Sequence, residues 1–501
     1  MPSTFRGRRY VIAGSLGAFI FFTFCWYSRQ NIWFQGTRSP PQNDVLSQEP
    51  PSQNEDGSPR PADSLATVLS PPGDYLPASS TPHQGRFCTE RFDLQYLNNL
   101  AKTQTSYCDA NSKSSITCFH SNIDPGGRTD SFCISGPASF DHSQKKFILD
   151  CSLRSLSDEE SSQGVPKFEN FPAYWYGTGP QQIFNNFVRL DRKEKPSHKL
   201  SHGRRNFSIL IKREDSHYNV FHSLMEIIGL TLTLDTMRMA RNRATGLPFF
   251  MPEDIANTQV IILDDLLDGP YFDLWKLFSK QPTIRLKDLS ASAQVNLDNI
   301  IVPLPGGGSP FWQSHWEPLQ CEQSELLQTF VKRVLNFYNI RDDGRPGDSP
   351  LVLTFIDRRE KRRLINQERH IERLKAKFPA VEVNVVDLAA LSFSEQIKLI
   401  HRTDILAGVH GAGLTHGMFL PPHSTIAEIL PPKLKHKGFR NLAKKMGHNY
   451  FSSHGAEHKT NDSKNDWQFD DIFIEEDRFM NLLEIAVKSM YNRGLRDQDV
   501  N

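Results

Sequence analysis

The residues with the clearest capacity for chemistry form a glycine-containing loop near the C-terminus. The apolar run LAGV (406–409) ends at His410-Gly411-Ala412-Gly413, and the apolar segment LTHGMFL (414–420) follows. Glycines let a ligand approach the backbone closely, and free amides at a helix start favour an anion. His410 adds a hydrogen-bond donor, or a positive charge when it is protonated. The pattern predicts a diphosphate site, with a tight turn beside a core histidine as the alternative.

Charged side chains follow neighbouring strand patterns in the same half of the chain. Glu428 lies in the apolar run TIAEIL, where a carboxylate at a strand end can accept hydrogen bonds from ribose hydroxyls. The alternative for Glu428 is a solvated strand end. A charge run from Asp357 to Arg363 follows the strand pattern LVLTFI, and such runs are usually solvated surface. Its position at the carboxyl end of a strand instead predicts that Arg358 and Arg362 bind diphosphate oxygens in two-pronged fashion.

A third group of polar residues interrupts an apolar helix pattern in the first half. His222 and Glu226 share one helix face, with Asn219 beside them, because residues four apart are neighbours on a helix. Buried ionisable groups are costly unless paired, so this stripe should face a cleft or satisfy itself. A carboxylate in partly apolar surroundings can have a raised pKa and serve as a general base. The pattern therefore predicts either an acid–base site or a structural His–Glu pair.

The acidic residues do not form a convincing metal site. The Asp-x-Asp triplet Asp497-Gln498-Asp499 lies in the polar tail, and the pair Asp264-Asp265 follows the strand pattern VIIL as a polar cap would. Arginine, histidine and backbone amides can neutralise a diphosphate without a divalent cation. We therefore expect no cofactor and no metal ligands, although a divalent metal is compatible with such a site.

Two stretches of alternating strand and helix patterns must position these side chains. The segments 208–212, 260–265 and 299–305 have the pattern of buried strands in the first stretch, and LVLTFI, VEVNVV, ILAGV and TIAEIL in the second. Such alternation implies parallel sheets wrapped by helices. A polar gap at 342–348 separates the two stretches. We expect an α/β protein with an N-terminal domain at 86–340, Cys-rich at its start, and a C-terminal domain at 350–490, with the ligand in the cleft between them.

The first 85 residues differ from the rest in composition. Residues 10–27 carry no charge, and a helix of that length spans roughly 27 Å, close to a thin bilayer core. Arginines precede this run, which predicts a cytoplasmic tail (1–9), a transmembrane signal-anchor (10–27) and a lumenal remainder. A cleaved signal peptide is the alternative, but no small-x-small cleavage site follows at the right place. Residues 28–85 are rich in Pro and Ser and predict a disordered stem.

Cysteine usage and charge fit a lumenal protein. The cysteines outside the anchor are Cys88, Cys108, Cys118, Cys133, Cys151 and Cys321. An even number in an oxidising compartment predicts up to three disulfides, with fifteen possible connectivities. A zinc site is the weaker alternative, because no Cys-x-x-Cys pair occurs. The triplets beginning at Asn206 and Asn461 match the N-glycosylation pattern, and a net charge of +1 argues against a nucleic-acid partner.

These motifs together resemble a known family. The segment HRTDILAGVHGAGLTHGMFLPPHSTIAEI (401–429) closely resembles the signature block of glycosyltransferase family 61. The family's Arg-x-x-x-Arg-x-x-x-Asn element corresponds to Arg358, Arg362 and Asn366. Its Asn-x-x-His-x-x-x-Asp/Glu element corresponds to Asn219, His222 and Glu226. The resemblance covers about residues 170–490.

The resemblance implies a fold, an activity and site residues. The fold would be GT-B, in which two Rossmann-like domains face each other across a cleft, and the reaction would invert the configuration at the sugar carbon. Glu226 or His222 would be the catalytic base, supported on the acceptor side by Asn219. The residues expected to bind the donor are Arg358, Arg362, Asn366, His410, Gly411, Ala412, Gly413, Leu414, Thr415 and Glu428. The partners would be a UDP-sugar donor, a protein or glycan acceptor, and a membrane through the N-terminal helix.

The implied reaction is transfer of N-acetylglucosamine from UDP-N-acetylglucosamine to a hydroxyl of a secretory-pathway protein or glycan. Transfer of xylose from UDP-xylose is one alternative, and a non-catalytic lumenal glycan-binding or scaffold protein is another. Because no C-terminal KDEL-type signal is present, we expect a single-pass type II protein of the Golgi membrane with a lumenal catalytic domain, rather than a protein of the endoplasmic reticulum.

Overall fold

The structure is a computed structural model. It describes residues 69–75, 84–121, 128–191, 205–215, 217, 219–289, 297–313, 315–341, 349–458, 466–492 and 497–499. All of them belong to one compact unit, Leu65–Asn501. The expected tail, the signal-anchor and most of the stem lie outside the described residues. Among the helices within them, none has the length and apolar character needed to cross a bilayer.

The N-terminal half is built on a seven-stranded mixed sheet. In spatial order its strands are β1 (Thr105–Ser106), β2 (Ser115–His120), β3 (Ser131–Gly136), β10 (Asn299–Val302), β7 (Phe207–Ile211), β8 (Thr258–Ile262) and β9 (Ile284–Arg285). The strands from β10 to β9 are parallel, whereas β1, β2 and β3 add to β10 as antiparallel strands. A separate three-stranded sheet contains β4 (Ala138–Asp141), β5 (Lys146–Leu149) and β6 (Val188–Leu190). The cysteine-rich start thus forms an antiparallel extension that the expected parallel sheet did not include.

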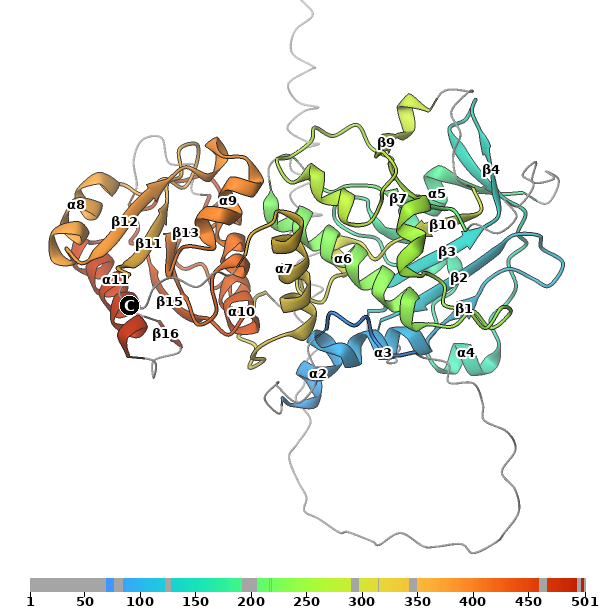
Figure 1. The fold of residues 1–501 in the computed structure, drawn as a ribbon, viewed down its shortest axis with the longest axis horizontal. Coiled ribbons are helices and arrows are strands. Elements are labelled where there is room, and N and C mark those ends of the chain that lie inside the picture. Colours follow the sequence, from blue (N-terminus) through green and yellow to red (C-terminus); the bar gives the residue numbers. More distant parts are fainter. Residues whose placement is uncertain are drawn as a thin grey trace, which may run out of the picture. The chain divides into compact units, whose positions relative to one another are not determined.

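The helices of this half cover the sheet and its N-terminal edge (Figure 1). They are α2 (Arg86–Phe92), α3 (Leu94–Lys102), α4 (Asp158–Ser162), α5 (Gly179–Phe187), α6 (Val220–Met239) and α7 (Glu325–Phe337). Helix α6 is the central one, and side chains on all of its faces are buried. Asn219 caps it by accepting a hydrogen bond from the Phe221 N–H at 3.1 Å. Gly229 lets the loop after β10 pack on the helix, because a Cβ there would lie 2.3 Å from the carbonyl oxygen of Leu304.

The C-terminal half is a fully parallel sheet of six strands. In spatial order these are β12 (Val381–Val386), β11 (Leu351–Ile356), β13 (Ile405–Val409), β14 (Thr425–Leu430), β15 (Asn449–His454) and β16 (Asp497–Asp499). Its helices are α8 (Gln367–Lys377), α9 (Phe393–Ile400), the 3-10 helix η8 (Ala412–Phe419), α10 (Gly438–Lys445) and α11 (Glu476–Tyr491). The strand order reverses between β11 and β13. In such sheets ligands bind beyond the carboxyl ends of the strands at the reversal point.

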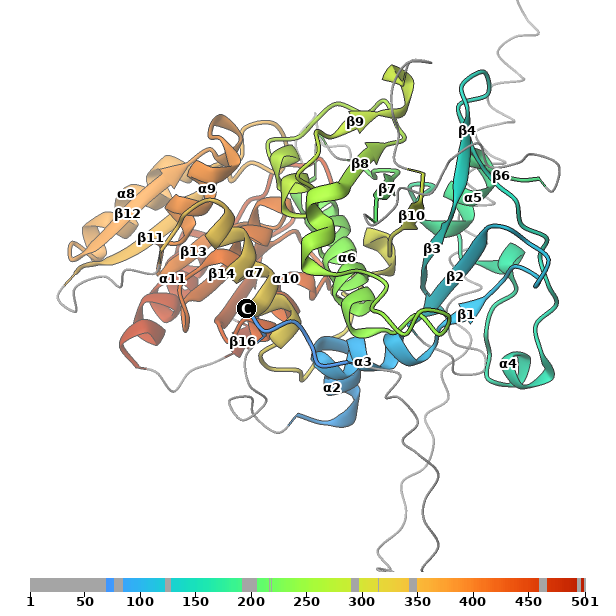
Figure 2. The same ribbon diagram turned by 45° about the vertical axis from the view of Figure 1, so that its right-hand side comes forward.

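The two sheets share one continuous apolar cluster. It contains side chains of α6, α7, η8 and α10, including Leu224, Leu327, Met418 and Phe439. Helices α6 and α7 both contact η8, and α7 lies between the two halves in both views (Figures 1 and 2). The α/β class expected from the sequence is therefore observed, with several sheets and with the two halves joined by a common core.

Three disulfides account for all six cysteines outside the expected anchor. They join Cys108 to Cys151, Cys118 to Cys133 and Cys88 to Cys321. The Cys118–Cys133 bond links directly opposed residues of β2 and β3. The cysteines are thus disulfide-bonded, as the oxidising compartment predicted, and none is left for the alternative zinc site.

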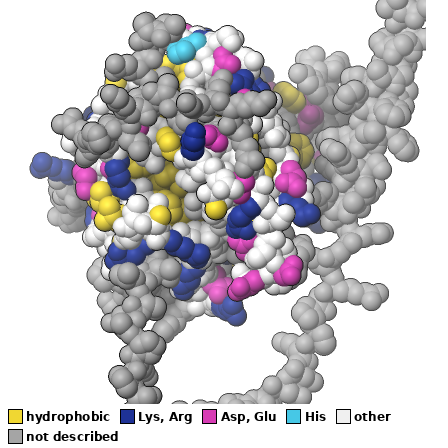
Figure 3. All heavy atoms as spheres, turned by 90° about the vertical axis from the view of Figure 1, so that its right-hand side faces the viewer, with side chains coloured by type: hydrophobic (Ala, Val, Ile, Leu, Met, Phe, Trp, Pro, Cys, Tyr) yellow, Lys and Arg dark blue, Asp and Glu magenta, His cyan; other side chains and the backbone are white. Residues whose placement is uncertain are grey.

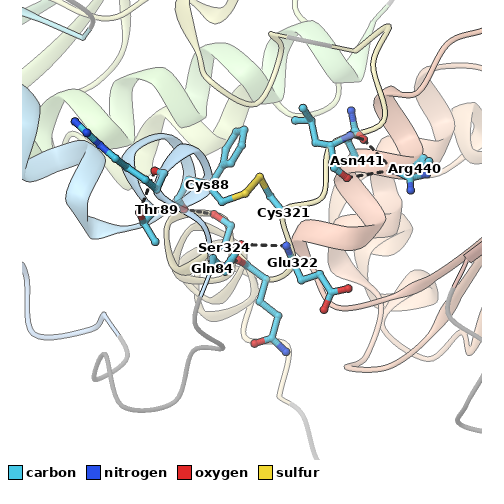
Figure 4. The surroundings of a disulfide bond; sticks show 12 residues. Gln84, Cys88, Thr89, Cys321, Glu322, Ser324, Arg440 and Asn441 are labelled. Carbon is cyan, nitrogen blue, oxygen red and sulfur yellow. Dashed lines mark hydrogen bonds between the residues drawn. A yellow bond between two sulfur atoms is a disulfide. The ribbon is translucent and has the colours of Figure 1, made fainter. Parts of the chain in front are cut away.

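The Cys88–Cys321 disulfide fixes the segment that leads from the first half into α7 (Figure 4). Beside it, the Gln84 side chain donates to the Gln323 carbonyl at 2.7 Å and accepts from the Glu322 N–H at 3.0 Å. On the other side, Asn441 of α10 donates to the Glu317 carbonyl at 2.8 Å. Residues 317–324 are therefore held by α2 from one direction and by α10 from the other.

Surface charge on the face formed by the first half is mixed. Figure 3 shows Lys and Arg side chains interspersed with Asp and Glu among the described residues of this face, around a small apolar area. This distribution agrees with the near-zero net charge of the chain.

Removing the Cys88–Cys321 disulfide should destabilise the protein more than removing the Cys118–Cys133 disulfide. The first closes a sequence separation of 233 residues and the second one of 15. On a chain-entropy basis the losses are about 5 and about 3 kcal/mol, respectively. Urea unfolding of the two double Cys→Ser variants measures the difference. Equal or reversed losses would show that residues 317–324 are held mainly by α10.

Candidate functional site

The strongest candidate site lies at the strand-order reversal of the C-terminal sheet. Arg358 follows β11, and His410 and Gly411 follow β13, the strand next to it. Arg358 lies directly on the glycine loop, because a Cβ on Gly411 would be 2.0 Å from its Nη1 atom. The sequence therefore needs glycine at position 411 for the guanidinium to occupy this place. Two motifs that are far apart in sequence meet here.

Two of the four arginines in the charge run have no carboxylate partner. Arg359 pairs with Asp357 at 3.0 Å and Arg363 with Asp471 at 2.5 Å. Arg358 and Arg362 make no ion pair with any described residue, and both are half-buried.

The half-buried guanidiniums are in an unfavourable state that an anion would relieve. Arg358 donates from Nε to the Lys361 carbonyl at 3.1 Å, whereas the buried Nε of Arg362 has no hydrogen-bond partner among the described residues. Burial, and then the nearby charge of Arg358, lower the pKa of Arg362 to about 10, with Asp466 and Glu428 opposing the change. Burial also lowers the pKa of Arg358. Two desolvated cations side by side fit a ligand with two negative charges.

His410 is oriented by a buried carboxylate. Its Nδ1–H donates to Oε1 of Glu428 at 2.5 Å, and the Tyr450 hydroxyl donates to Oε2 of Glu428 at 2.5 Å. Glu428 is fully buried. A carboxylate can only accept, so the proton of His410 lies on Nδ1 and its Nε2 is left for another contact. Both carboxylate oxygens of Glu428 therefore accept hydrogen bonds from within the protein, and neither faces solvent. In this structure Glu428 orients the imidazole of His410, which differs from the expected contact with ribose.

The remaining residues expected to bind the donor differ in how far their side chains are exposed to solvent. Ala412 and Gly413 are partly exposed, whereas Leu414 and Thr415 are buried and their side chains lie in the protein interior. Leu414 and Thr415 can therefore reach a ligand only through their backbone. Asn366 is exposed at the start of α8 and makes no side-chain cap there. The structure gives it no contact with Arg358 or His410.

The second polar cluster surrounds His222 at the start of α6. The His222 Nδ1–H donates to Oδ1 of Asp215 at 2.5 Å, and Asn219 Nδ2 donates to His222 Nε2 at 3.2 Å. The imidazole stacks on Trp312, with 4.2 Å between ring centroids and 17° between planes. Tyr176 lies on another side at 5.0 Å. This is a histidine held by a carboxylate between aromatic rings.

A row of aromatic contacts connects the two clusters. His315 donates from Nδ1 to the Trp312 carbonyl at 2.6 Å and stacks on His436, with centroids 5.0 Å apart. His436 in turn lies 4.8 Å from His410. Burial, and then the neighbouring His410 and His315, lower the pKa of His436 to about 2, so its ring is neutral. The row places His222 and His410 on the same side of the shared core.

Glu226 has surroundings unlike those of His222, although the two share a helix face. Its Oε1 accepts from the Glu214 N–H at 2.6 Å, and its Oε2 has no hydrogen-bond partner among the described residues. Burial, and then the charge of Glu214, raise the pKa of Glu226 well above its usual value. Burial raises the pKa of Glu214 to about 8. The two carboxyl groups face each other beneath the loop that carries Gly306, whose Cβ would lie 3.0 Å from the Glu226 Cγ.

The described residues contain few side chains placed to bind a metal ion together. No group of three or more His, Cys, Asp and Glu residues there is arranged to hold an ion. Asp264, of the acidic pair considered in the sequence, pairs with the buried Arg213 at 2.8 Å.

The two glycosylation triplets have different outcomes. Asn206 is half-buried at the start of β7, and its amide donates to Asp298 Oδ2 at 2.8 Å. Its Ser208 is fully buried in the central strand. This placement argues against a glycan on Asn206 in the folded protein, because the amide nitrogen would have to leave its partner. Asn461 lies outside the described residues.

Sequence reasoning missed Asp215, Glu214, Trp312 and Tyr450. Glu214 and Asp215 follow the carboxyl end of β7, the same signal that identified the arginine run after β11. Trp312 and Tyr450 carry no comparable signal, because their roles depend on which loops pack together.

Known proteins match the part of the chain that carries most of this site. The family model for glycosyltransferase 61 matches residues 220–427. The EGF domain-specific O-linked N-acetylglucosamine transferase of Rattus norvegicus is 32% identical over 222 residues, which are 43% of this chain and 39% of the relative. The transferase of the same name from Mus musculus is 28% identical over 43% of this chain and 39% of its own length. That from Drosophila melanogaster is 27% identical over 45% of this chain and 41% of its own length.

The matches are thus partial, and the chain spans about two fifths of the length of these curated relatives. The matched region includes helix α6, the arginine run and the glycine loop. Asp215 and Tyr450 lie outside it. The resemblance predicted from the sequence is confirmed over residues 220–427, where this chain matches glycosyltransferase family 61 and its relatives are named as sugar transferases.

Proposed function

We propose that this protein is an inverting glycosyltransferase of GT-B type that transfers N-acetylglucosamine from UDP-N-acetylglucosamine to a hydroxyl of a secretory-pathway protein or glycan. The observation that carries the proposal is a pair of half-buried arginines without an ion-pair partner among the described residues: Arg358, which lies on the glycine loop, and Arg362 near it. The relatives' names support the sugar. The expected signal-anchor and the disulfides support a single-pass type II protein of the Golgi membrane.

The donor would bind with its diphosphate between the arginines and His410. As the bond between the sugar carbon and the phosphate oxygen breaks, negative charge develops on the leaving diphosphate. Arg358 and Arg362 lie where they can stabilise this charge, and the Nε2 side of His410 faces away from Glu428. These side chains supply positive charge of the kind that a divalent cation supplies in other sites, so activity should survive treatment with EDTA.

His222 is the better of the two expected bases. Attack by the acceptor oxygen on the sugar carbon releases one proton, which His222 Nε2 would take while Nδ1–H stays bonded to Asp215. The amide of Asn219, which now donates to Nε2, would have to turn aside as the acceptor enters. Glu226 is unsuited to this task, because burial beside Glu214 keeps it protonated and a protonated carboxyl cannot accept a proton.

Nucleotide-sugar binding can be tested on the purified full-length chain by thermal unfolding. Binding to the folded state raises the apparent Tm with ligand concentration. We expect UDP-N-acetylglucosamine to raise it more than UDP-xylose at equal concentration. A larger shift with UDP-xylose would make UDP-xylose the proposed donor. If no UDP-sugar raised the Tm, the protein would instead be a non-catalytic lumenal protein.

Arg362→Ala should weaken UDP binding about 10- to 100-fold, because a charge-assisted hydrogen bond contributes ~1.5–3 kcal/mol. Turnover should fall further, by about 10²–10³-fold, since the leaving group carries more charge in the transition state. The control is Arg363→Ala in the same loop, whose guanidinium pairs with Asp471 at the surface. Equal UDP affinity in the two variants would remove the diphosphate role of Arg362.

His222→Gln should lower the rate of UDP release by about 10²–10⁴-fold while UDP affinity stays unchanged, because a general base acts on the proton and does not bind the diphosphate. Glu226→Gln should stay within about tenfold of wild type. The rates can be measured with methyl glycosides and Ser/Thr peptides as trial acceptors. The opposite ranking of the two variants would make Glu226 the base.

The protonated state of Glu226 predicts a pH-dependent stability. Unfolded carboxyls lose their protons near the ordinary value of 4.5, whereas in the folded protein burial raises the pKa of Glu214 to about 8 and that of Glu226 well above its usual value. The stability contributed by the pair is therefore complete below pH 4.5 and is lost as the pH rises through about 8. Glu226→Gln is uncharged at every pH, so its Tm should rise relative to wild type between pH 5 and 8. The control is Glu372→Gln on the exposed side of α8, whose Tm should change with pH in the same way as that of wild type. If the Tm of Glu226→Gln also followed that of wild type across this pH range, Glu226 would not be protonated in the folded protein.

A further inference from the structure

An unusually exposed tryptophan, Trp175, precedes Tyr176, whose ring lies 5.0 Å from that of the proposed base. Trp175 is 91% exposed, whereas its neighbour Tyr174 is buried and Tyr176 is 39% exposed. A tryptophan is rarely left almost entirely in water, and an exposed large apolar side chain next to a functional group commonly marks a binding surface. Neither Trp175 nor Tyr176 falls in the region matched by the family model.

The exposure of Trp175 is imposed by a well-anchored loop. The Tyr174 hydroxyl donates to Asp130 Oδ1 at 2.6 Å, and the Arg128 guanidinium lies 4.7 Å from the centroid of the Tyr174 ring. Gly179 has a φ of +84°, and a Cβ there would lie 2.7 Å from the Tyr174 ring. Since the residue before Trp175 is fixed in the interior, the indole is directed outward by the backbone.

Tyr176 connects this indole to the proposed base. Its ring lies 5.0 Å from that of His222, on a different side from the stacked Trp312. Burial, and then the charges of Asp215 and Glu214, raise the pKa of Tyr176 to about 12, so its hydroxyl stays protonated and can donate a hydrogen bond. An acceptor whose hydroxyl reaches His222 would thus have its neighbouring atoms against Tyr176, and Trp175 is the adjoining exposed residue of the same loop.

We propose that Trp175 and Tyr176 form the acceptor platform and that it takes a pyranose ring of a glycan. A pyranose ring has one face of C–H groups, which packs on an aromatic face, and a rim of hydroxyls, which bond to carboxylates and phenols. The loop supplies aromatic faces and the Tyr176 phenol, and Asp215, whose Oδ1 accepts from His222, is a carboxylate close to Tyr176.

A polypeptide acceptor fits this surface less well. The loop 171–178 exposes no leucine, isoleucine, valine or methionine, and its other exposed side chain is that of Ala173. It therefore offers isolated aromatic faces without the aliphatic pockets that hold peptide side chains. The platform rests on the proposed function, since it assumes that the acceptor hydroxyl meets His222.

Binding of sugars without any donor tests the platform. The full-length protein would be titrated with methyl glycosides of glucose, galactose, mannose, fucose, xylose and N-acetylglucosamine, and with Ser/Thr peptides, using saturation-transfer NMR. We expect at least one glycoside to receive saturation on its ring C–H protons. Trp175→Ala should weaken that binding about five- to tenfold, and Trp175→Phe, which keeps an aromatic face, should retain most of it.

The matched control is Tyr491→Ala, which removes a 64% exposed aromatic ring on α11 and should leave glycoside binding unchanged. Unchanged binding in Trp175→Ala, binding of peptides alone, or binding of no glycoside would each overturn the platform. The UDP-induced rise in Tm is measured on the same variants. If UDP raises the Tm as in wild type but no glycoside binds, only the platform proposal is rejected. If a glycoside binds but UDP does not raise the Tm, the proposed transfer reaction is rejected.

Discussion

The arrangement of the C-terminal site depends on keeping two positive charges close together in a half-buried place where no described carboxylate forms an ion pair with either of them. Burial lowers the pKa of both Arg358 and Arg362, and the charge of Arg358 lowers that of Arg362 as well. Such a state is unfavourable in isolation. Arg358 lies against Gly411, which leaves room for the guanidinium, and Asp357 and Asp471 pair with the neighbouring Arg359 and Arg363. More distant carboxylates, Glu360, Asp466 and Glu428, offset the positive charge only in part. The unfavourable electrostatics are relieved when an anion with two charges arrives.

Two histidines, one in helix α6 and one in the loop after β13, are prepared in the same way. Asp215 fixes His222 through Nδ1, and Glu428 fixes His410 through Nδ1. In each case the carboxylate determines which nitrogen carries the proton and turns Nε2 outward. The proposed tasks are opposite, because one histidine takes a proton from the acceptor and the other faces the leaving diphosphate. Neither Glu214 nor Glu226 holds a histidine among the described residues, and burial raises the pKa of both carboxyl groups.

The relative position of these histidines is maintained by packing far from the chemistry. Helices α6 and α7 contact η8 through one apolar cluster, so the sheets do not behave as separate bodies joined only by a linker. The Cys88–Cys321 disulfide and the contacts of Asn441 hold residues 317–324 between the halves. The Trp312–His315–His436 row then completes the connection at the site itself.

The sequence by itself determined the α/β class, the positions of the central strands, the number of disulfides and the resemblance to family 61. These depend on local periodicity, cysteine count and motif spacing, which can be read directly from the sequence. It also identified Arg358, Arg362, His410 and His222 as polar residues at strand and helix ends. Only the tertiary structure decided that Glu428 holds His410, that Glu226 is buried against Glu214, and that Asp215, Trp312 and Tyr176 surround His222. These relations join residues on separate loops, and burial, which sets the proton state of a carboxyl group, is a property of the packed molecule and not of its local sequence.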